Sequence, residues 1–139
     1  MSVNDVRKQI VANALSHLGK PYSMDPALRL GPVAFDCSGL AWHCYMSAGV
    51  SVDNNLMDWV AEPISRDALL PGDLVYIGFE TRPMFKWPTG SHVGIYVGDG
   101  DVVHSTSKTG NVVRERIEAR NWTWYGRVPA AHWPGGENT

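Results

Sequence analysis

The chain has 139 residues, of which 44% are hydrophobic and 19% charged, and its net charge is −2 at pH 7. This length and composition are typical of one folded domain with a single core, and they exclude a disordered or fibrous protein. The slightly acidic charge balance argues against nucleic acid or an anionic membrane as the partner.

The first predicted element is an amphipathic helix over residues 3–18. Apolar side chains recur there at intervals of three and four residues, which indicates a helix with one buried face. Ser2 and Asp5 can form a capping box at its start, and Gly19 supplies a stop. His17, near the end of this helix, is interpreted as a structural or merely exposed side chain.

A loop is expected from Gly19 to Pro32, because proline and glycine interrupt this segment repeatedly. The loop leads directly to the next helix, so it can form one wall of a site there. Tyr22 is either a half-buried aromatic side chain or a phenolic donor in that site.

A second helix is predicted to begin after Asp36, a suitable N-cap, and to end near Gly49. Cys37 falls in its first turn, where the helix dipole favours a thiolate and the free amides can hold an oxyanion. A cysteine in this position can equally be a small apolar residue that fills space. The expected buried face of the helix consists of Leu40, Ala41, Cys44 and Tyr45.

Cys37 and Cys44 are the two cysteines of the chain. Two helical turns separate their Cα atoms by about 10 Å, which is beyond the reach of a disulfide. At least one thiol is therefore expected to be free. Cys44 is predicted to face the core and His43 to lie on the other side of the helix, and we assign neither to a site.

The middle of the chain contains a possible short helix over residues 54–60, with Leu56, Trp59 and Val60 facing inward. The turn Pro71-Gly72-Asp73 then precedes a strand over residues 74–77. The long segment from Phe79 to Ser91 carries Phe85 and Trp87. A long loop of this kind is often functional, so these two aromatics are candidates for a substrate groove, although the loop can also simply pack on itself.

The C-terminal half is predicted to be rich in strands, at residues 92–97, 102–106, 112–117 and 125–128, with turns at Gly98-Asp99-Gly100 and Thr109-Gly110-Asn111. Helices followed by an antiparallel meander predict an α+β domain over residues 1–133, with the Cys37 helix packed on the sheet. Residues 134–139 have the composition of a linker. Four arginines alternate with acidic residues in a pattern typical of a solvated strand face: Arg114, Arg116, Arg120 and Arg127 with Glu115 and Glu118. His132, near the C-terminal end, is not assigned to a site.

His92 and His104 lie on adjacent strands of one predicted hairpin, and its register decides whether they meet. An even number of loop residues would turn the two side chains to opposite faces. A three-residue loop, with Gly98 or Gly100 in a bulge, would place His104 opposite Gly94 or Tyr96 and on the face of His92. A relay of Cys37, His92 and His104 is therefore available, because a cysteine nucleophile needs a base and the base needs an orienting group.

The same three side chains are also competent zinc ligands, and three ligands with an open position is a catalytic zinc pattern. Their spacing along the chain matches no standard zinc signature. A zinc protein therefore stays open as an alternative to a metal-free cysteine enzyme.

Five motifs, in this order, closely resemble those of the NlpC/P60 cysteine peptidases. They are Gly19-Lys20-Pro21-Tyr22, Phe35-Asp36-Cys37-Ser38-Gly39-Leu40, Pro71-Gly72-Asp73-Leu74-Val75, His92-Val93-Gly94-Ile95-Tyr96-Val97-Gly98-Asp99-Gly100 and Val103-His104. The resemblance spans most of the chain. The related CHAP amidases share the papain-like fold, but the second and third motifs fit NlpC/P60 better.

The resemblance implies a papain-like α+β core and hydrolysis of an amide bond in the stem peptides of bacterial peptidoglycan, between D-glutamate and a diamino acid. Cys37 would be the nucleophile, His92 the base and His104 the group that orients His92. Tyr22 would help to hold the oxyanion, and Asp36 and Ser38 would help to position the substrate. No metal or organic cofactor would be needed.

Two departures from the family pattern flank the expected groove. Residues 23–30 replace a short glycine-containing turn, and the loop at residues 79–91 is longer than expected. An amidase of the same fold, which would cut the glycan–peptide junction, and a non-catalytic wall-binding module are the alternative functions.

The expected partner is peptidoglycan, with no nucleic acid and no membrane, and the protein is expected to be a monomer. No signal peptide or apolar run of membrane-spanning length is evident in the sequence. We therefore expect synthesis in a bacterial cytoplasm and action on the wall after release or injection, as in the catalytic domain of a phage endolysin, a virion-associated lysin or an antibacterial effector.

Overall fold

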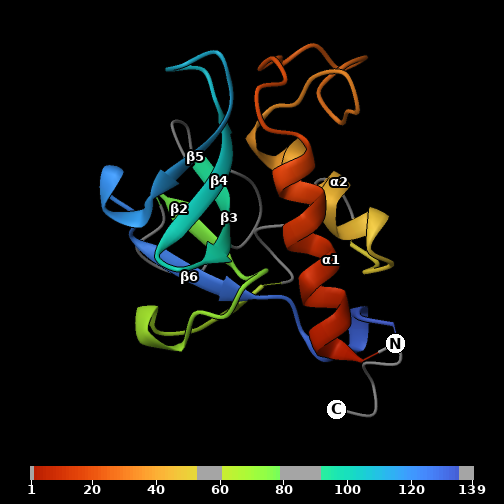
Figure 1. Cartoon of the computed structure of the whole chain (residues 1–139), viewed down its shortest axis with the longest axis vertical. Helices are drawn as coiled ribbons and strands as arrows, with labels where there is room; N and C mark the ends of the chain where they lie inside the picture. The colour runs from red at the N-terminus through yellow and green to blue at the C-terminus, as the bar shows by residue number, and fades with distance from the viewer. Residues whose placement is uncertain (1, 53–60, 79–91, 135–139) are drawn as a thin grey trace.

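The computed structural model describes residues 2–52, 61–78 and 92–134 (Figure 1). The helix expected at residues 54–60 and the loop at residues 79–91, with Phe85 and Trp87, lie outside these ranges. So does the end of the predicted linker, from residue 135 onward.

The described chain folds into two helices packed on a six-stranded antiparallel sheet, as the sequence predicts for an α+β domain (Figure 1). The strand order is β1-β6-β2-β3-β4-β5. The expected meander holds from β2 to β5, but the last strand, β6, pairs with β1 and β2 instead of β5, because the chain crosses over after β5. The strands are β1 (Glu62–Pro63), β2 (Leu74–Ile77), β3 (His92–Gly98), β4 (Asp101–Thr106), β5 (Asn111–Arg116) and β6 (Trp124–Arg127). Short 3₁₀ turns at Arg66–Ala68, Ile117–Ala119 and Ala130–His132 complete the elements. β1 was not expected from the sequence, because two residues are too few to show a strand period.

The two helices lie side by side over one face of the sheet (Figure 1). α1 (Val3–Ser16) begins with the predicted capping box between Ser2 and Asp5, and it ends two residues earlier than expected. α2 (Cys37–Ser47) begins at the predicted N-cap, Asp36, and ends just before Gly49. None of the described helices is long and apolar enough to cross a membrane.

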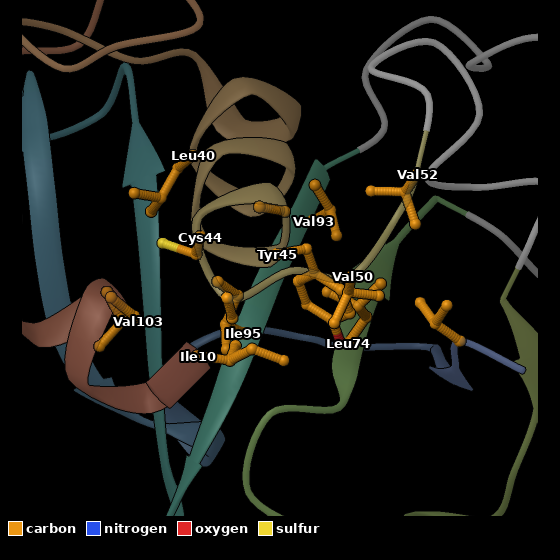
Figure 2. Close-up of a cluster of buried hydrophobic side chains, with 14 of the residues drawn as sticks. Ile10, Leu40, Cys44, Tyr45, Val50, Val52, Leu74, Val93, Ile95 and Val103 are labelled. Carbon is orange, nitrogen blue, oxygen red and sulfur yellow. The ribbon is translucent and has the colours of Figure 1, made fainter. Parts of the chain in front are cut away.

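The main core lies between α2 and the sheet (Figure 2). Leu40, Cys44 and Tyr45 form the buried face of α2, as their spacing predicts, and they pack with Val93 and Ile95 of β3. The apolar alternation of the central strands brings these side chains to the helix-covered face of the sheet. This packing fixes α2, and with it Cys37 at its first turn, against β3.

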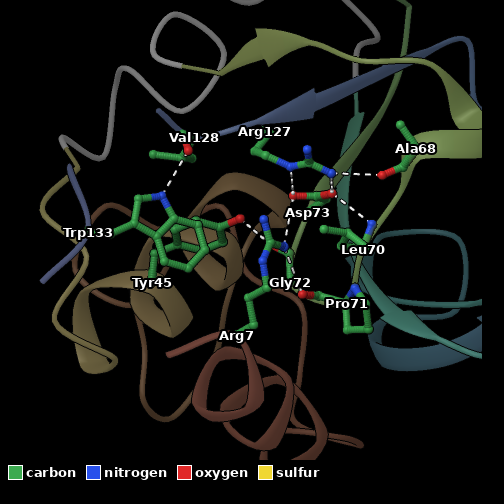
Figure 3. A network of polar contacts seen from close by, with 10 residues as sticks. All are labelled: Arg7, Tyr45, Ala68, Leu70, Pro71, Gly72, Asp73, Arg127, Val128 and Trp133. Carbon is green, nitrogen blue, oxygen red and sulfur yellow. Dashed lines mark hydrogen bonds and ion pairs between the residues drawn. The ribbon is translucent and has the colours of Figure 1, made fainter. Parts of the chain in front are cut away.

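The turn before β2 holds a buried ionic network around Asp73 (Figure 3). The Asp73 carboxylate is fully buried and accepts hydrogen bonds from Arg7 Nη1 at 3.1 Å and from Arg127 Nη2 at 2.8 Å. The Leu70 amide donates to it at 2.8 Å, and the Tyr45 hydroxyl donates to the carbonyl of Gly72. The network thus connects α1, α2 and β6 at one turn, which explains the Pro-Gly-Asp motif structurally.

His17 is buried, so of its two interpretations the structural one is correct. Its ring packs on Phe35 and His43, with centroids 4.8 and 5.1 Å away. His43 Nδ1 donates to the carbonyl of Leu30 at 3.2 Å. This cluster packs against the segment that precedes α2, at Leu30 and Phe35.

Candidate active site

Cys37 is placed by the cap of α2. The Asp36 carboxylate accepts a hydrogen bond from the Gly39 amide at 2.6 Å and another from Arg29 Nε at 2.7 Å. A Cβ atom at position 39 would lie 1.9 Å from the carbonyl oxygen of Arg29, so only glycine allows this approach. The Asp-Cys-Ser-Gly motif therefore fixes the first turn of α2 against the preceding loop.

Two further contacts tie the segment before α2 to the rest of the site. The Ser105 hydroxyl of β4 donates to the carbonyl of Phe35 at 2.8 Å. Tyr22 forms an isolated parallel bridge with Phe35, and its amide donates to the carbonyl of Gly110 at 2.9 Å. The predicted loop from residue 19 onward therefore does form a wall beside Cys37.

The hairpin of β3 and β4 brings His92 and His104 together. Ile95 pairs with Val103, and the register shifts between Tyr96 and Gly98. Continuing this register places His104 opposite Gly94, on the face of His92, which is one of the two outcomes that the sequence left open. His92 Nε2 lies 2.6 Å from His104 Nδ1, and the ring planes are inclined at 70°.

Trp122 covers both imidazoles. Its ring stacks on His92 with centroids 5.7 Å apart and meets His104 edge-on at 5.3 Å. A Cβ atom on Gly94 would lie 3.1 Å from Trp122 and 2.7 Å from Val102. Gly94 thus gives Trp122 room to pack against the pair, which accounts for the glycine in the His-Val-Gly motif.

Glu115 and Arg120 extend this hydrogen-bonded chain. His104 Nε2 lies 2.7 Å from Glu115 Oε1. Arg120 donates to both oxygens of Glu115, from Nε at 3.0 Å and from Nη2 at 3.1 Å. The prediction of a merely solvated charged face is wrong here, because these two side chains turn toward the histidines.

The other three arginines of the charged pattern also form both exposed and buried ion pairs. Arg114 and Arg116 form exposed ion pairs with Asp101, as predicted, whereas Arg127 reaches the buried carboxylate of Asp73. The sequence does contain a signal for Glu115. β4 and β5 form a tight hairpin in which Glu115 pairs with Val102, so Glu115 shares the face of His104 as its diagonal neighbour.

A cavity of about 300 Å³ opens between α2 and the hairpin. It brings together three residues singled out in the sequence, Tyr22, Cys37 and His92, and is also lined by Ile77, Thr106, Ser107, Lys108 and Arg120. Asp36 and Ser38 are buried and do not line the cavity, and the Ser38 hydroxyl lies 3.4 Å from the Asp36 carboxylate. Any effect of Asp36 or Ser38 on a substrate would therefore be indirect.

The thiol of Cys37 is half-buried at the first turn of α2. Burial and the nearby Asp36 carboxylate raise its pKa to about 11, although backbone amides, among them that of Val93, act in the opposite direction. Desolvation at this position therefore opposes the tendency of the helix N-terminus to favour a thiolate.

The pKa values of both imidazoles are lowered. Burial, the neighbouring His104 and the Arg120 cation lower the pKa of His92 to about 3. Burial also lowers the pKa of His104, against the opposing effect of Glu115. The directions of these pKa shifts favour a neutral thiol and neutral imidazoles over an ion pair.

The rate constant for alkylation of Cys37 by iodoacetamide is therefore expected to rise about tenfold per pH unit through the neutral and mildly alkaline range, since only the thiolate reacts. Mass spectrometry of the peptides that contain Cys37 and Cys44 measures the alkylation rate of each thiol. Buried Cys44, whose pKa burial raises to about 12, serves as the internal reference and should stay unmodified in the folded protein. A rate constant for Cys37 that is independent of pH from acidic solution upward would contradict the neutral pair.

The zinc alternative finds no support in the geometry. Within residues 2–52, 61–78 and 92–134, no group of three or more histidine, cysteine or acidic side chains is arranged to hold a metal ion. His92 Nε2 and His104 Nδ1 face each other at hydrogen-bond distance instead of converging on a third point.

The remaining candidates lie elsewhere. Cys44 is in the core, as predicted, and the ring of His43, also on α2, packs against His17. His132 Nδ1 donates to the carbonyl of Ser51 at 2.8 Å. The arrangement that can do chemistry is therefore a thiol and an imidazole in one cavity, with the second ring nitrogen of that imidazole held by a further polar group.

The chain is similar to known proteins in sequence and in fold. The model of the NlpC/P60 family matches residues 19–127. The probable endopeptidase p60 of Listeria monocytogenes is 35% identical over 119 residues, which cover 84% of this chain and 22% of that protein. The chain therefore spans about a fifth of the length of this curated relative.

Solved structures share the fold. NlpC1 from Trichomonas vaginalis superposes with a TM-score of 0.72 at 24% identity, over 92% of this chain and 45% of that one. RipD from Mycobacterium tuberculosis, described as a non-catalytic NlpC/p60 domain protein adapted to peptidoglycan binding, gives a TM-score of 0.69 at 24% identity, over 88% of this chain and 97% of that one.

Proposed function

This chain belongs to the NlpC/P60 family, and from that premise we propose that it is a cysteine hydrolase that cuts an amide bond in the stem peptides of bacterial peptidoglycan. One observation carries the proposal. Cys37, at the start of α2, shares a cavity with His92, whose Nε2 is held at 2.6 Å by His104. A nucleophile, a base and an orienting group are the minimum that such a reaction needs.

The proposed reaction begins with the neutral pair. His92 takes the Cys37 proton while the sulfur attacks the amide carbonyl, since neither charge is stable alone in the buried site. The oxyanion that forms is held by the Cys37 amide and the Tyr22 hydroxyl. His92 then gives its proton to the leaving amine, and a thioester remains on Cys37.

Water completes the turnover. The neutral imidazole of His92 takes a proton from a water molecule, which attacks the thioester carbonyl. Collapse of the second oxyanion releases the acid product and returns the proton to Cys37. The atoms balance as one amide and one water giving one acid and one amine, and no cofactor takes part.

The charges around the cavity support a substrate with a free carboxylate. Lys108 and Arg120 both line it, and no acidic side chain does so among the described residues. A glutamate joined through its side-chain carboxyl keeps its α-carboxylate, so the bond between D-glutamate and the diamino acid fits this cavity. We therefore assign the cleavage to that bond.

A non-catalytic binding role, as the description of RipD states for that protein, is the second candidate. This chain combines a thiol, an imidazole and an orienting imidazole in one site, and a binding module has no need of them. An amidase of the same fold would use the same three groups, so the two enzyme activities differ only in the bond that enters the cavity.

The amino group that appears on digestion identifies the bond. Purified peptidoglycan treated with the protein is labelled with fluorodinitrobenzene and hydrolysed, and the labelled amino acid is identified. We expect a newly labelled α-amino group on the diamino acid. Newly labelled alanine would mean an amidase, and no new label at any protein concentration would favour the binding role.

A further inference from the structure

We propose that Glu115, clamped by Arg120, is a positioning residue that fixes the tautomers of His104 and His92 and so leaves Nδ1 of His92 unprotonated for Cys37. The site would then be an ordered chain of five side chains rather than a triad. This inference rests on the proposed function for its meaning, but its main test needs no turnover.

The direction of the chain is set at Glu115. Two hydrogen bonds from Arg120 lower the pKa of this carboxyl to about 2, so it is ionised at neutral pH. An ionised carboxylate can only accept hydrogen bonds. His104 Nε2, 2.7 Å from Glu115 Oε1, must therefore carry a hydrogen and donate it.

The consequence for His104 follows from its neutral state. A neutral imidazole has one N–H, and here it is on Nε2, so Nδ1 offers a lone pair. His92 Nε2 lies 2.6 Å from that Nδ1. Since one of the two nitrogens must donate, the hydrogen lies on Nε2 of His92.

His92 is left with one possible arrangement. With its single hydrogen on Nε2, its Nδ1 is the free base. The opposite arrangement, in which His104 donates from Nδ1, would put the hydrogen of His92 on Nδ1 and block proton transfer from Cys37. That arrangement would also turn the lone pair of His104 Nε2 toward the Glu115 carboxylate, where two acceptors repel each other.

Arg120 keeps the carboxylate in place for this task. It donates to both oxygens, and such a bidentate pair fixes orientation as well as position. Only about a quarter of the Glu115 side chain is exposed, whereas Glu118, nearby in the chain, is 62% exposed and lies 3.7 Å from Arg116. Glu118 is therefore a matched control on the same surface.

The direct test is the protonation pattern of the imidazoles. Two-bond ¹H–¹⁵N correlation spectra of the protein with labelled histidine distinguish the two tautomers of each ring. In the unmodified protein at neutral pH we expect His92 and His104 both to carry hydrogen on Nε2. In Glu115→Ala a fraction of both rings should shift to the Nδ1–H form, and in Glu118→Ala neither should change.

Activity supplies the second readout, in the release of soluble fragments from peptidoglycan. Glu115→Ala should lower kcat roughly 10- to 100-fold, the usual effect of losing an outer orienting partner, with little change in KM. Glu115→Gln should recover most of this loss. With its amide oxygen at the position of Oε1, glutamine still accepts from His104 Nε2 and Arg120 Nε and loses only the bond from Arg120 Nη2. The opposite orientation of the amide would lose two donors, so the oxygen stays turned to His104.

The outcomes separate the two proposals. An Nδ1–H tautomer of His92 in the unmodified protein would overturn the proposed role of Glu115. So would spectra of Glu115→Ala that are identical to those of the unmodified protein. Equal losses in Glu115→Gln and Glu115→Ala would overturn it too, because charge alone would then explain the effect. If the unmodified protein hydrolyses no peptidoglycan, the proposed function fails while the spectra still decide the tautomer.

Discussion

Replacing Cys37 with alanine is expected to abolish hydrolysis of peptidoglycan while the fold remains intact. No other thiol lines the described cavity, so the acyl intermediate cannot form without the Cys37 sulfur. Loss of a nucleophile in such a catalytic unit costs at least about 10³-fold in kcat. The initial rate of fragment release measures this loss, and circular dichroism with a thermal melt checks the fold.

Cys44→Ala is the matched control for this variant. Cys44 lies on the same helix but is fully buried in the core, so its replacement should cost some stability and leave the rate per folded molecule unchanged. Loss of activity in Cys44→Ala with an intact fold would show that the assignment to Cys37 is incomplete.

Replacing Asp73 with alanine is expected to lower the free energy of unfolding by about 3–5 kcal/mol, since it leaves buried cationic groups without their partner. Arg7 is itself largely buried, and it would keep only its bond to the carbonyl of Pro71 at 3.0 Å from the same nitrogen. Arg127 would lose both its contacts with the carboxylate. Urea denaturation followed by tryptophan fluorescence measures the change.

Asp101→Ala is the comparison for Asp73. Its carboxylate also contacts two arginines, Arg114 and Arg116, but their side chains are 41% and 62% exposed. Water screens such pairs, so this variant should cost less than about 1 kcal/mol. Equal losses in the two variants would show that burial does not determine the strength of the Asp73 network.

The fold was largely predictable because its elements are locally encoded. The capping residues Ser2 and Asp36, the apolar spacing in α1 and α2 and the alternation in β3 and β4 each identify an element. The order of β3, β4 and β5 followed from short turns, whereas the position of β6 beside β2 did not. The two-residue strand β1 could not be predicted, because its pairing with β6 depends on tertiary contact alone.

The candidate site was predictable in part. The residue types and their motifs identified Cys37, His92 and His104, but the register of the hairpin had to come from three dimensions. Trp122 and Arg120 come from the segment between β5 and β6, whose path the local sequence does not fix. The effect of burial on the pKa of the Cys37 thiol could not be predicted, because a helix N-terminus is visible in a sequence and burial is not.

The most direct test of the account is mass spectrometry of purified peptidoglycan digested with the unmodified protein and with Cys37→Ala, each with and without a chelator. The account predicts stem-peptide fragments cut between D-glutamate and the diamino acid from the unmodified protein alone, in equal amounts with the chelator. The same fragments from Cys37→Ala would contradict Cys37 as the nucleophile.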